Sequence, residues 1–522
     1  MKRKIFNILL CFYLLLSGCN IGSSPTPVTT LPVGDTPTPS HPTEGAFNNR
    51  SNCGNQSLAM KPDVITDLSK KAALTCYQID LSIEPETGSY KGQETVLFHN
   101  STDVSLSEVV FRLYPNAPVI FGGEIRVDNA SVAGQPTSFE HFLIDATGLR
   151  IFLPVPLKQN ETVTISIAFT GKVPDAISSE KFQYGIFYQG DQRDLWVLAN
   201  FYPILAIFSE QEWQAREVIG IGDPVTSETA LYDVHITLPV GWKLASTGKI
   251  VAEELLINNR VRYSAISGPQ RDFILVIGKN LTQSSIVTKD GISISQYSTS
   301  SRASSNSGVA LKVAQQAMEF FEKSFGEYPF NELDIVAVPL QNAFGVEFPG
   351  LILIQDALYA DPNEYDTFAV VIAHEIAHQW WYNQVGNDVY LHPWMDEALA
   401  TYSSLAYARS VALPFYEGLK EYEQNRVKGE EAKLGQQPIT NPLPYYLQSE
   451  TMYGSIVYQK GALFLDALRA KIGDEAFSRA LQDYFLSYRF MIAAPKNLLG
   501  EFQTACKCGL TDFFQQWNVT SR

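Results

Sequence analysis

Two histidines four residues apart, with a glutamate directly after the first, occur in the segment His374-Glu375-Ile376-Ala377-His378. Residues four apart lie on one face of a helix, so both imidazoles can reach the same metal ion. Glu375 would lie about 100° around the helix from His374, near the ion without needing to bind it. The spacing therefore predicts a metal site with a carboxylate held beside the ion.

A catalytic zinc ion usually takes three protein ligands and leaves one position open for water. Glu397 is the candidate for the third ligand, because eighteen residues separate it from His378 and Pro393 favours a helix start just before it. That gap lets one helix end, the chain turn and a second helix return beside the first. Asp388 and Asp396 lie close enough in sequence to be alternatives.

The same stretch contains Val370, Val371, Ile372 and Trp380, which would also suit an ordinary buried helix. A core helix would not normally bury two histidines and a glutamate without partners, because unpaired buried charge costs several kcal/mol. The pattern therefore favours a zinc site over a plain core helix.

Helix signals surround this segment. Asp361-Pro362-Asn363-Glu364 offers an N-cap residue, a first-turn proline and a capping-box glutamate, so we expect a helix from here to about Val385, ended by Gly386. Strands are predicted at 333–338 and 351–354. An earlier helix that ends at Gly326 is predicted from one apolar face, formed by Leu311, Ala314, Met318, Phe321 and Phe325.

The first half of the chain follows a period of two from about residue 73 to 279, with frequent Gly, Pro, Asn and Asp between the runs. This pattern predicts mostly antiparallel sheets with one solvated face. The serine-rich stretch 298–307 is expected to link this half to the helical one. One clear run sets Val163, Ile165, Ile167 and Phe169 against Thr162, Thr164 and Ser166.

The N-terminus has the form of an export signal. Three basic residues at positions 2–4 precede an apolar stretch at 5–16 that is too short to span a bilayer. Leu16-Ser17-Gly18-Cys19 resembles the lipobox of bacterial lipoproteins, which implies a lipid on Cys19, although an ordinary secretory signal is the alternative. Residues 20–52 are expected to be a Pro/Thr-rich linker that tethers the protein to the membrane, outside the cytoplasm.

Composition narrows the class of protein. The 522 residues carry a formal net charge of −16, which argues against a general nucleic-acid binder, because such a protein needs a basic face. Export permits disulfides, and a Cys53–Cys76 bridge is plausible. A bridge between Cys506 and Cys508 would be strained, so two free or separately paired thiols remain the alternative.

Three motifs together resemble the gluzincin aminopeptidases, the family of aminopeptidase N and leukotriene hydrolase. The first is the His-Glu-x-x-His segment followed by Trp394-Met395-Asp396-Glu397-Ala398. The second is Gly345-Val346-Glu347-Phe348-Pro349-Gly350, similar to the family's Gly-Ala-Met-Glu-Asn loop. The third contains Tyr453 and Tyr458.

The resemblance implies an α+β multidomain fold. An N-terminal antiparallel β-sandwich or saddle domain would occupy residues 53–300. A thermolysin-like, mostly helical catalytic domain with a small sheet would occupy residues 301–522.

The resemblance also implies a zinc peptidase that acts on peptides with free N-termini. One Zn²⁺ per chain would be held by His374, His378 and Glu397. Glu375 would be the general base, and Tyr458 would stabilise the transition state.

The second motif would bind substrate. Glu347 would hold the free amino group, and Gly345 belongs to the same loop. Tyr453 either lines the pocket or packs between helices. Asn200 is a weak candidate for the residue that the family's first domain contributes to amine binding, and a surface turn is the alternative.

The chain departs from the family pattern at Phe348, where the family has Asn. The resemblance also implies that the large helical domain over the cavity is absent, which would leave the cleft open. An open-cleft zinc endopeptidase and a catalytically silent peptide-binding lipoprotein of the same fold therefore remain alternatives to an aminopeptidase.

Overall fold

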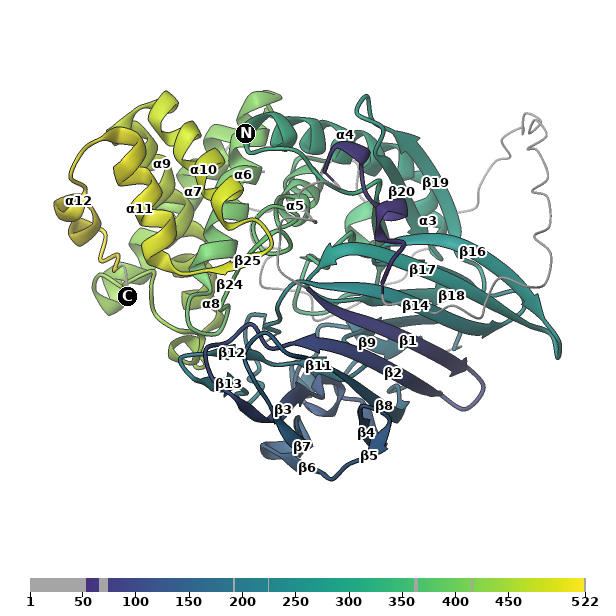
Figure 1. The fold of residues 1–522 in the computed structure, drawn as a ribbon. Coiled ribbons are helices and arrows are strands. Elements are labelled where there is room, and N and C mark those ends of the chain that lie inside the picture. Colours follow the sequence, from purple (N-terminus) through teal and green to yellow (C-terminus); the bar gives the residue numbers. More distant parts are fainter. Residues whose placement is uncertain are drawn as a thin grey trace, which may run out of the picture. The chain divides into compact units, whose positions relative to one another are not determined.

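The computed structural model describes residues 53–64, 74–190, 193–223, 225–360, 365–414 and 416–520 (Figure 1). The predicted signal peptide (1–19), the lipid site at Cys19 and the linker (20–52) lie outside these ranges. The predicted helix start at 361–364 lies outside them as well.

The first half of the described chain is built from sheets (Figure 1). The largest has eight described strands, in the order β16 (Lys249–Leu256), β17 (Arg260–Gln270), β14 (Ala230–Pro239), β1 (Thr75–Glu84), β2 (Ser89–His99), β8 (Thr162–Lys172), β4 (Glu124–Val132) and β5 (Gln135–Pro136).

Three smaller sheets complete this half. Their described strands are β15 (Lys243–Ser246), β18 (Ile274–Gly278), β10 (Leu195–Ala199) and β9 (Phe187–Gln189); β11 (Ile204–Leu205), β3 (Leu106–Arg112), β7 (Gly148–Leu157) and β6 (Phe139–Phe142); and β12 (Ile207–Ser209) with β13 (Glu212–Gln214).

The predicted alternation is confirmed in these strands. In β8, Ile165, Ile167 and Phe169 are buried while their neighbours are partly exposed. Such strands place one face on a core and the other toward water. The sheets are mostly antiparallel, as predicted, but β1 pairs with β14 in parallel.

The second half is mainly helical. Its described helices are α3 (Ser301–Ser305), α4 (Ser307–Ser324), α5 (Tyr365–Ala377), α6 (Trp394–Ser410), α7 (Tyr416–Leu434), α8 (Glu450–Tyr453), α9 (Gly461–Ile472), α10 (Asp474–Tyr488), α11 (Pro495–Cys506) and α12 (Thr511–Gln516), with a π-helical segment at Gly454–Lys460.

A five-stranded sheet belongs to this half in the described chain, in the order β19 (Thr282–Val287), β20 (Ser293–Ser298), β21 (Glu332–Val338), β23 (Leu351–Gln355) and β22 (Gly345–Val346). Because β20 pairs with β21 in parallel, the sheet of the helical half starts near residue 282 and not after residue 300. The serine-rich stretch runs from the end of β20 through α3 to the start of α4, so most of it is helical.

The helix with the two histidines is shorter than predicted. α5 ends at Ala377, eight residues before Val385, which instead starts β24 (Val385–Asn387). Beyond Ala377 the amides of Gln379 and Trp380 donate hydrogen bonds to the carbonyl oxygens three residues earlier, as in a turn and not an α-helix. Val385 lies in a strand that pairs with β25 (Met491–Ala493). The pairing with a distant strand overrides the local helical pattern.

The four cysteines of the described chain form two disulfides. The structure contains the Cys53–Cys76 disulfide, as predicted. It also contains a Cys506–Cys508 disulfide, which rules out the alternative of free or separately paired thiols. The reason is Lys507, whose φ of 54° turns the chain back and brings the two Cα atoms to 5.2 Å.

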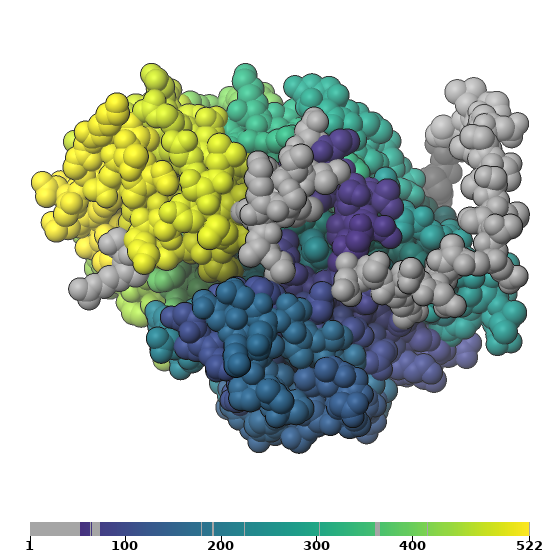
Figure 2. All heavy atoms as spheres, viewed as in Figure 1, coloured from purple at the N-terminus to yellow at the C-terminus, as the bar shows by residue number. Residues whose placement is uncertain are grey.

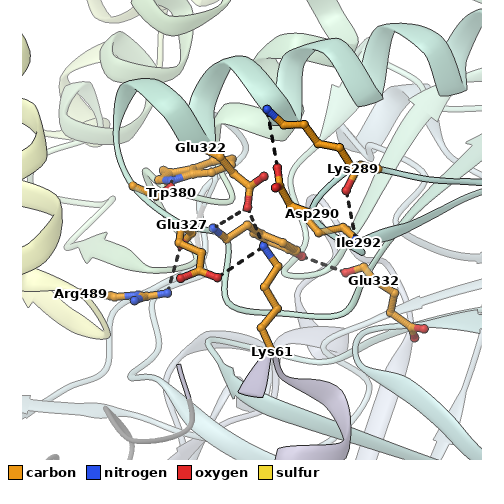
Figure 3. Close-up of polar contacts among 12 residues, drawn as sticks. Lys61, Lys289, Asp290, Ile292, Glu322, Glu327, Glu332, Trp380 and Arg489 are labelled. Carbon is orange, nitrogen blue, oxygen red and sulfur yellow. Dashed lines mark hydrogen bonds and ion pairs between the residues drawn. The ribbon is translucent and has the colours of Figure 1, made fainter. Parts of the chain in front are cut away.

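The segment 53–64 crosses onto the helical half (Figure 2, purple). Met60 forms a bridge with Phe330, and the Lys61 amide donates to Pro329 O at 2.9 Å. The Lys61 ammonium lies 2.7 Å from a Glu322 oxygen and 3.6 Å from a Glu327 oxygen, as Figure 3 shows. This segment therefore joins the disulfide on β1 to the end of α4.

None of the helices in the described ranges is both long enough and apolar enough to span a bilayer.

Candidate zinc centre

Two neighbouring helices supply the predicted metal ligands. α5 carries His374 and packs against α6, α4 and the strands β22 and β23, and His378 directly follows its last residue, with its amide bonded to His374 O at 3.3 Å. Pro393 is the N-cap residue of α6, as the sequence predicted, and places Glu397 in the first turn of that helix. The three side chains therefore meet although α5 is shorter than expected.

The donor atoms have the spacing that zinc requires. The two histidine Nε2 atoms lie 3.2 Å apart, and Glu397 Oε2 lies 3.3 Å from that of His374 and 3.4 Å from that of His378. Tetrahedral bonds of 2.0–2.1 Å would place donors about 3.3–3.4 Å apart. Glu397 Oε2 is also buried without a hydrogen bond. These residues therefore fit one zinc ion.

The acids that were alternatives to Glu397 have other partners. Asp388 forms an ion pair with Arg216 at 2.9 Å. Asp396 accepts a hydrogen bond from the Glu397 amide at 2.9 Å. Asp396 therefore stabilises the first turn of α6 and does not join the described donor group.

The orientation of His378 is fixed by the turn after α5. Its Nδ1 lies 3.0 Å from the carbonyl oxygen of Trp381 and, since a carbonyl can only accept, must donate to it. The Nε2 lone pair is then free to bind a metal. His378 is 1% exposed, so this tautomer is held away from water.

Two further carboxylates lie beside this ligand. One donor atom each from Glu347, Glu375 and His378 lie within 4.8 Å of one another. The main chain of Gly345 packs so closely on Glu375 that a Cβ at Gly345 would lie 2.3 Å from its Oε1. Only glycine at position 345 therefore leaves room for Glu375.

The pKa values of the Glu397, Glu375 and Glu347 carboxylates are shifted in different directions. Burial opposes the charge of Glu397, but the neighbouring His374 and His378 outweigh it and hold its pKa at about 2. Burial, and next the Glu347 carboxylate, raise the pKa of Glu375 well above its usual range. Burial also raises the pKa of Glu347, although His378 opposes the shift. The space beside the ligands is therefore rich in acid, which favours a cation there.

Tyr458 reaches the ligands from the π-helical segment. Its hydroxyl donates to Glu397 Oε1, and its ring stacks on His374 with centroids 5.9 Å apart. Tyr453 is 7% exposed, with its ring centroid 5.4 Å from that of Tyr458. Single π-turns occur often at functional sites, and no sequence motif marks this one.

Comparisons with known proteins agree with this geometry. Residues 309–517 match the model of the peptidase family M1 domain. This part of the chain is therefore similar to the peptidase family M1 domain. This finding confirms the resemblance to the gluzincin aminopeptidases. The M1 domain and its donor set imply one catalytic zinc ion.

The relatives agree with the M1 assignment. The chain is 23% identical over 435 residues, 80% of its length, to aminopeptidase N of Lactococcus lactis subsp. lactis, of which 50% is covered. It is 28% identical over 223 residues, 41% of its length, to aminopeptidase M1-B of Oryza sativa subsp. japonica, of which 25% is covered. The chain thus spans between a quarter and a half of the length of these curated relatives.

A solved structure matches the fold. It is an M1 zinc metallopeptidase from Deinococcus radiodurans, with a TM-score of 0.64 and 19% sequence identity over 86% of this chain and 94% of that one. The match confirms the predicted fold class, a β half followed by a mostly helical half.

The departure at Phe348 has a local explanation in the M1 domain. Phe348 is 5% exposed and packs in the core of the β half. Gln379, the residue after His378, donates to Phe348 O at 3.1 Å and accepts from the Gly350 amide at 2.9 Å. The loop with Glu347 is thereby fixed to the end of α5.

Sequence reasoning missed Asp223 and misplaced Asn200. Burial, and next the Glu347 carboxylate, raise the pKa of Asp223 well above its usual range. No motif marks Asp223, which follows a turn at Gly222. Asn200 is fully buried next to Asp272, so the surface-turn alternative was wrong.

Proposed function

We propose that the chain is a zinc-dependent aminopeptidase that hydrolyses the N-terminal peptide bond of peptides. The observation that carries this proposal is the grouping of Glu347 and Glu375 beside the ligand His378, within 4.8 Å. One carboxylate can bind an ammonium group while the other moves a proton. A free amino end would then lie one residue from the reacting bond.

Each residue of the site would have a different role in peptide hydrolysis. Zinc bound to His374, His378 and Glu397 would act as a Lewis acid toward water and the peptide carbonyl. Glu375 would accept a proton from the attacking water and pass it to the leaving amine. The Tyr458 hydroxyl would turn from Glu397 to the carbonyl oxygen, where one well-aimed donor is worth about 3 kcal/mol.

The amino end of the peptide would meet acids from both halves. Glu347 comes from the β22–β23 loop, and after burial its carboxylate is the largest cause of the raised pKa of Asp223 in the β half. An ammonium group has three donors and can bond both carboxylates. An acetylated end has no charge and would leave the buried Glu347 carboxylate without a cation, which is costly. This arrangement favours an aminopeptidase over an endopeptidase.

A panel of aminoacyl-arylamides with free and acetylated amino groups, assayed with and without a chelator, tests the function. We expect cleavage of the free substrates alone, loss of activity with the chelator and recovery with added zinc. Equal cleavage of acetylated substrates would favour the open-cleft endopeptidase. A zinc-loaded protein that hydrolyses nothing would favour the peptide-binding lipoprotein.

Substitution of Glu347 by glutamine tests the amine site. We expect kcat/KM for free-amine substrates to fall about 10–150-fold, because a charge-assisted hydrogen bond contributes about 1.5–3 kcal/mol. Steady-state kinetics on matched free and acetylated substrates measures the difference. Glu319→Gln on α4 is the control and should leave both rates unchanged. An equal loss on the two substrates would show that Glu347 does not bind the amine.

We further propose that the protein is held on the extracytoplasmic side of the membrane by a lipid on Cys19. The lipobox-like segment and the linker after it support this location. Cys19→Ala should move the protein from the membrane fraction to the soluble fraction without loss of peptidase activity, as fractionation and immunoblotting would show. A variant that stays in the membrane fraction would refute the lipid anchor.

A further inference from the structure

One arginine of the β half has its guanidinium group entirely inside the molecule. Arg271 follows the end of β17 and is 1% exposed. Its Nε donates to the carbonyl of Tyr382, and its two terminal nitrogens donate to Ser227 O at 3.0 Å and to Met491 O at 2.7 Å. A Cβ at Gly386 would lie 2.1 Å from the guanidinium carbon, so glycine is required there. Arg271 therefore binds main chain of both halves.

Asp272, the residue after Arg271, binds the side-chain hydroxyl of Tyr382. Asp272 is 1% exposed, and its Oδ2 accepts a hydrogen bond from the Tyr382 hydroxyl at 2.7 Å. Tyr382 has a φ of 152°, a conformation that side-chain-bearing residues rarely adopt. Two consecutive residues of the β half thus fix both the backbone and the side chain of a strained residue in the helical half.

Tyr382 lies in the turn that orients the ligand His378. The residue before it, Trp381, supplies the carbonyl that accepts from His378 Nδ1 at 3.0 Å. The residue after it, Asn383, donates its amide to His378 O at 2.9 Å. A change in the backbone at Tyr382 would therefore move the groups that set the ring orientation of His378.

We propose that Arg271 and Asp272 are positioning residues that hold His378 in its metal-binding orientation through the turn at Tyr382. The metal site is thus completed by the β half, although that half supplies no ligand in the described donor group. This inference rests on the proposed zinc site and adds residues that do not touch the ion. Loss of the hydrogen-bond partners that orient a histidine ligand typically weakens metal binding about 10–100-fold.

Three variants test the inference: Arg271→Met, Asp272→Asn and Tyr382→Phe. Two matched controls lie on β17. Arg260→Met removes a guanidinium that bonds Ile83 O and Thr237 O, and Tyr263→Phe removes a hydroxyl that bonds Trp242 O. The zinc dissociation constant is measured by chelator competition, the Co²⁺-loaded proteins are compared by visible absorption, and Tm is measured for each metal-free protein.

We expect Arg271→Met to weaken zinc binding about 10–100-fold and Tyr382→Phe about 10-fold, with altered Co²⁺ spectra. The controls should bind zinc and Co²⁺ as the unchanged protein does, even if their Tm falls. If Arg271→Met fails to fold, Tyr382→Phe and Asp272→Asn decide the question. Folded variants with unchanged zinc affinity and spectra would overturn this inference alone. An unchanged protein that binds no zinc would overturn the proposed function as well.

Discussion

Substitution of Glu375 by glutamine should lower kcat about 10²–10⁴-fold while the protein keeps its zinc. Glutamine has nearly the same shape, so it would still fit against Gly345, but its amide cannot accept the proton of the attacking water. Glu375 is not within the group of ligands formed by His374, His378 and Glu397. The expected signature is therefore a loss of turnover with little change in metal content or KM.

The measurement combines steady-state kinetics on an aminoacyl-arylamide with zinc analysis of the same preparation. Glu319→Gln, on α4 and away from the ligands, serves as the matched control and should keep full activity. If Glu375→Gln were nearly as active as the unchanged protein, another group would have to be the base. If it lost its zinc, Glu375 would have to be counted among the metal-binding residues.

Much of the candidate site could be predicted because its residues are close in sequence or fixed by local rules. His374 lies in α5 and His378 directly follows its last residue, one turn further on, and Pro393 starts the helix that carries Glu397. The alternation of buried and partly exposed residues in β8 is likewise a local property that sequence shows directly. Predictions of this kind depend on only a few neighbouring residues.

The errors arose where distant segments override the local pattern. The sequence favours helix up to Val385, but pairing of β24 with β25 places that residue in a strand. Asp223, Arg271 and Tyr382 carry no recognisable motif, because their roles depend on contacts between the two halves. Such contacts cannot be read from spacing.

Removal of the metal ligand Glu397 is the second change for which we expect a large effect, here on zinc affinity. Glu397→Gln keeps the size of the side chain but replaces a charged oxygen donor with a neutral amide. Loss of groups that merely orient a ligand costs about 10–100-fold in metal affinity, so loss of a ligand should cost more than about 10²-fold. Peptidase activity should fall in parallel at limiting zinc. Glu423→Gln is the control, since Glu423 is buried on α7 and its pKa is already raised to about 8 by burial.

Thermal unfolding with and without zinc gives a readout that does not depend on turnover. A ligand present at about 100 times its Kd stabilises the folded state by about 2.7 kcal/mol, so added zinc should raise the Tm of the unchanged protein and of Glu423→Gln. The same zinc concentration should leave the Tm of Glu397→Gln nearly unchanged. A normal zinc-dependent rise in that variant would mean that the ion does not need the Glu397 carboxylate. Tyr458 donates to the Glu397 carboxylate, so Glu397→Gln removes a partner of the π-helical segment. Near-UV circular dichroism of the metal-free variant, compared with the unchanged protein, checks that this segment is folded.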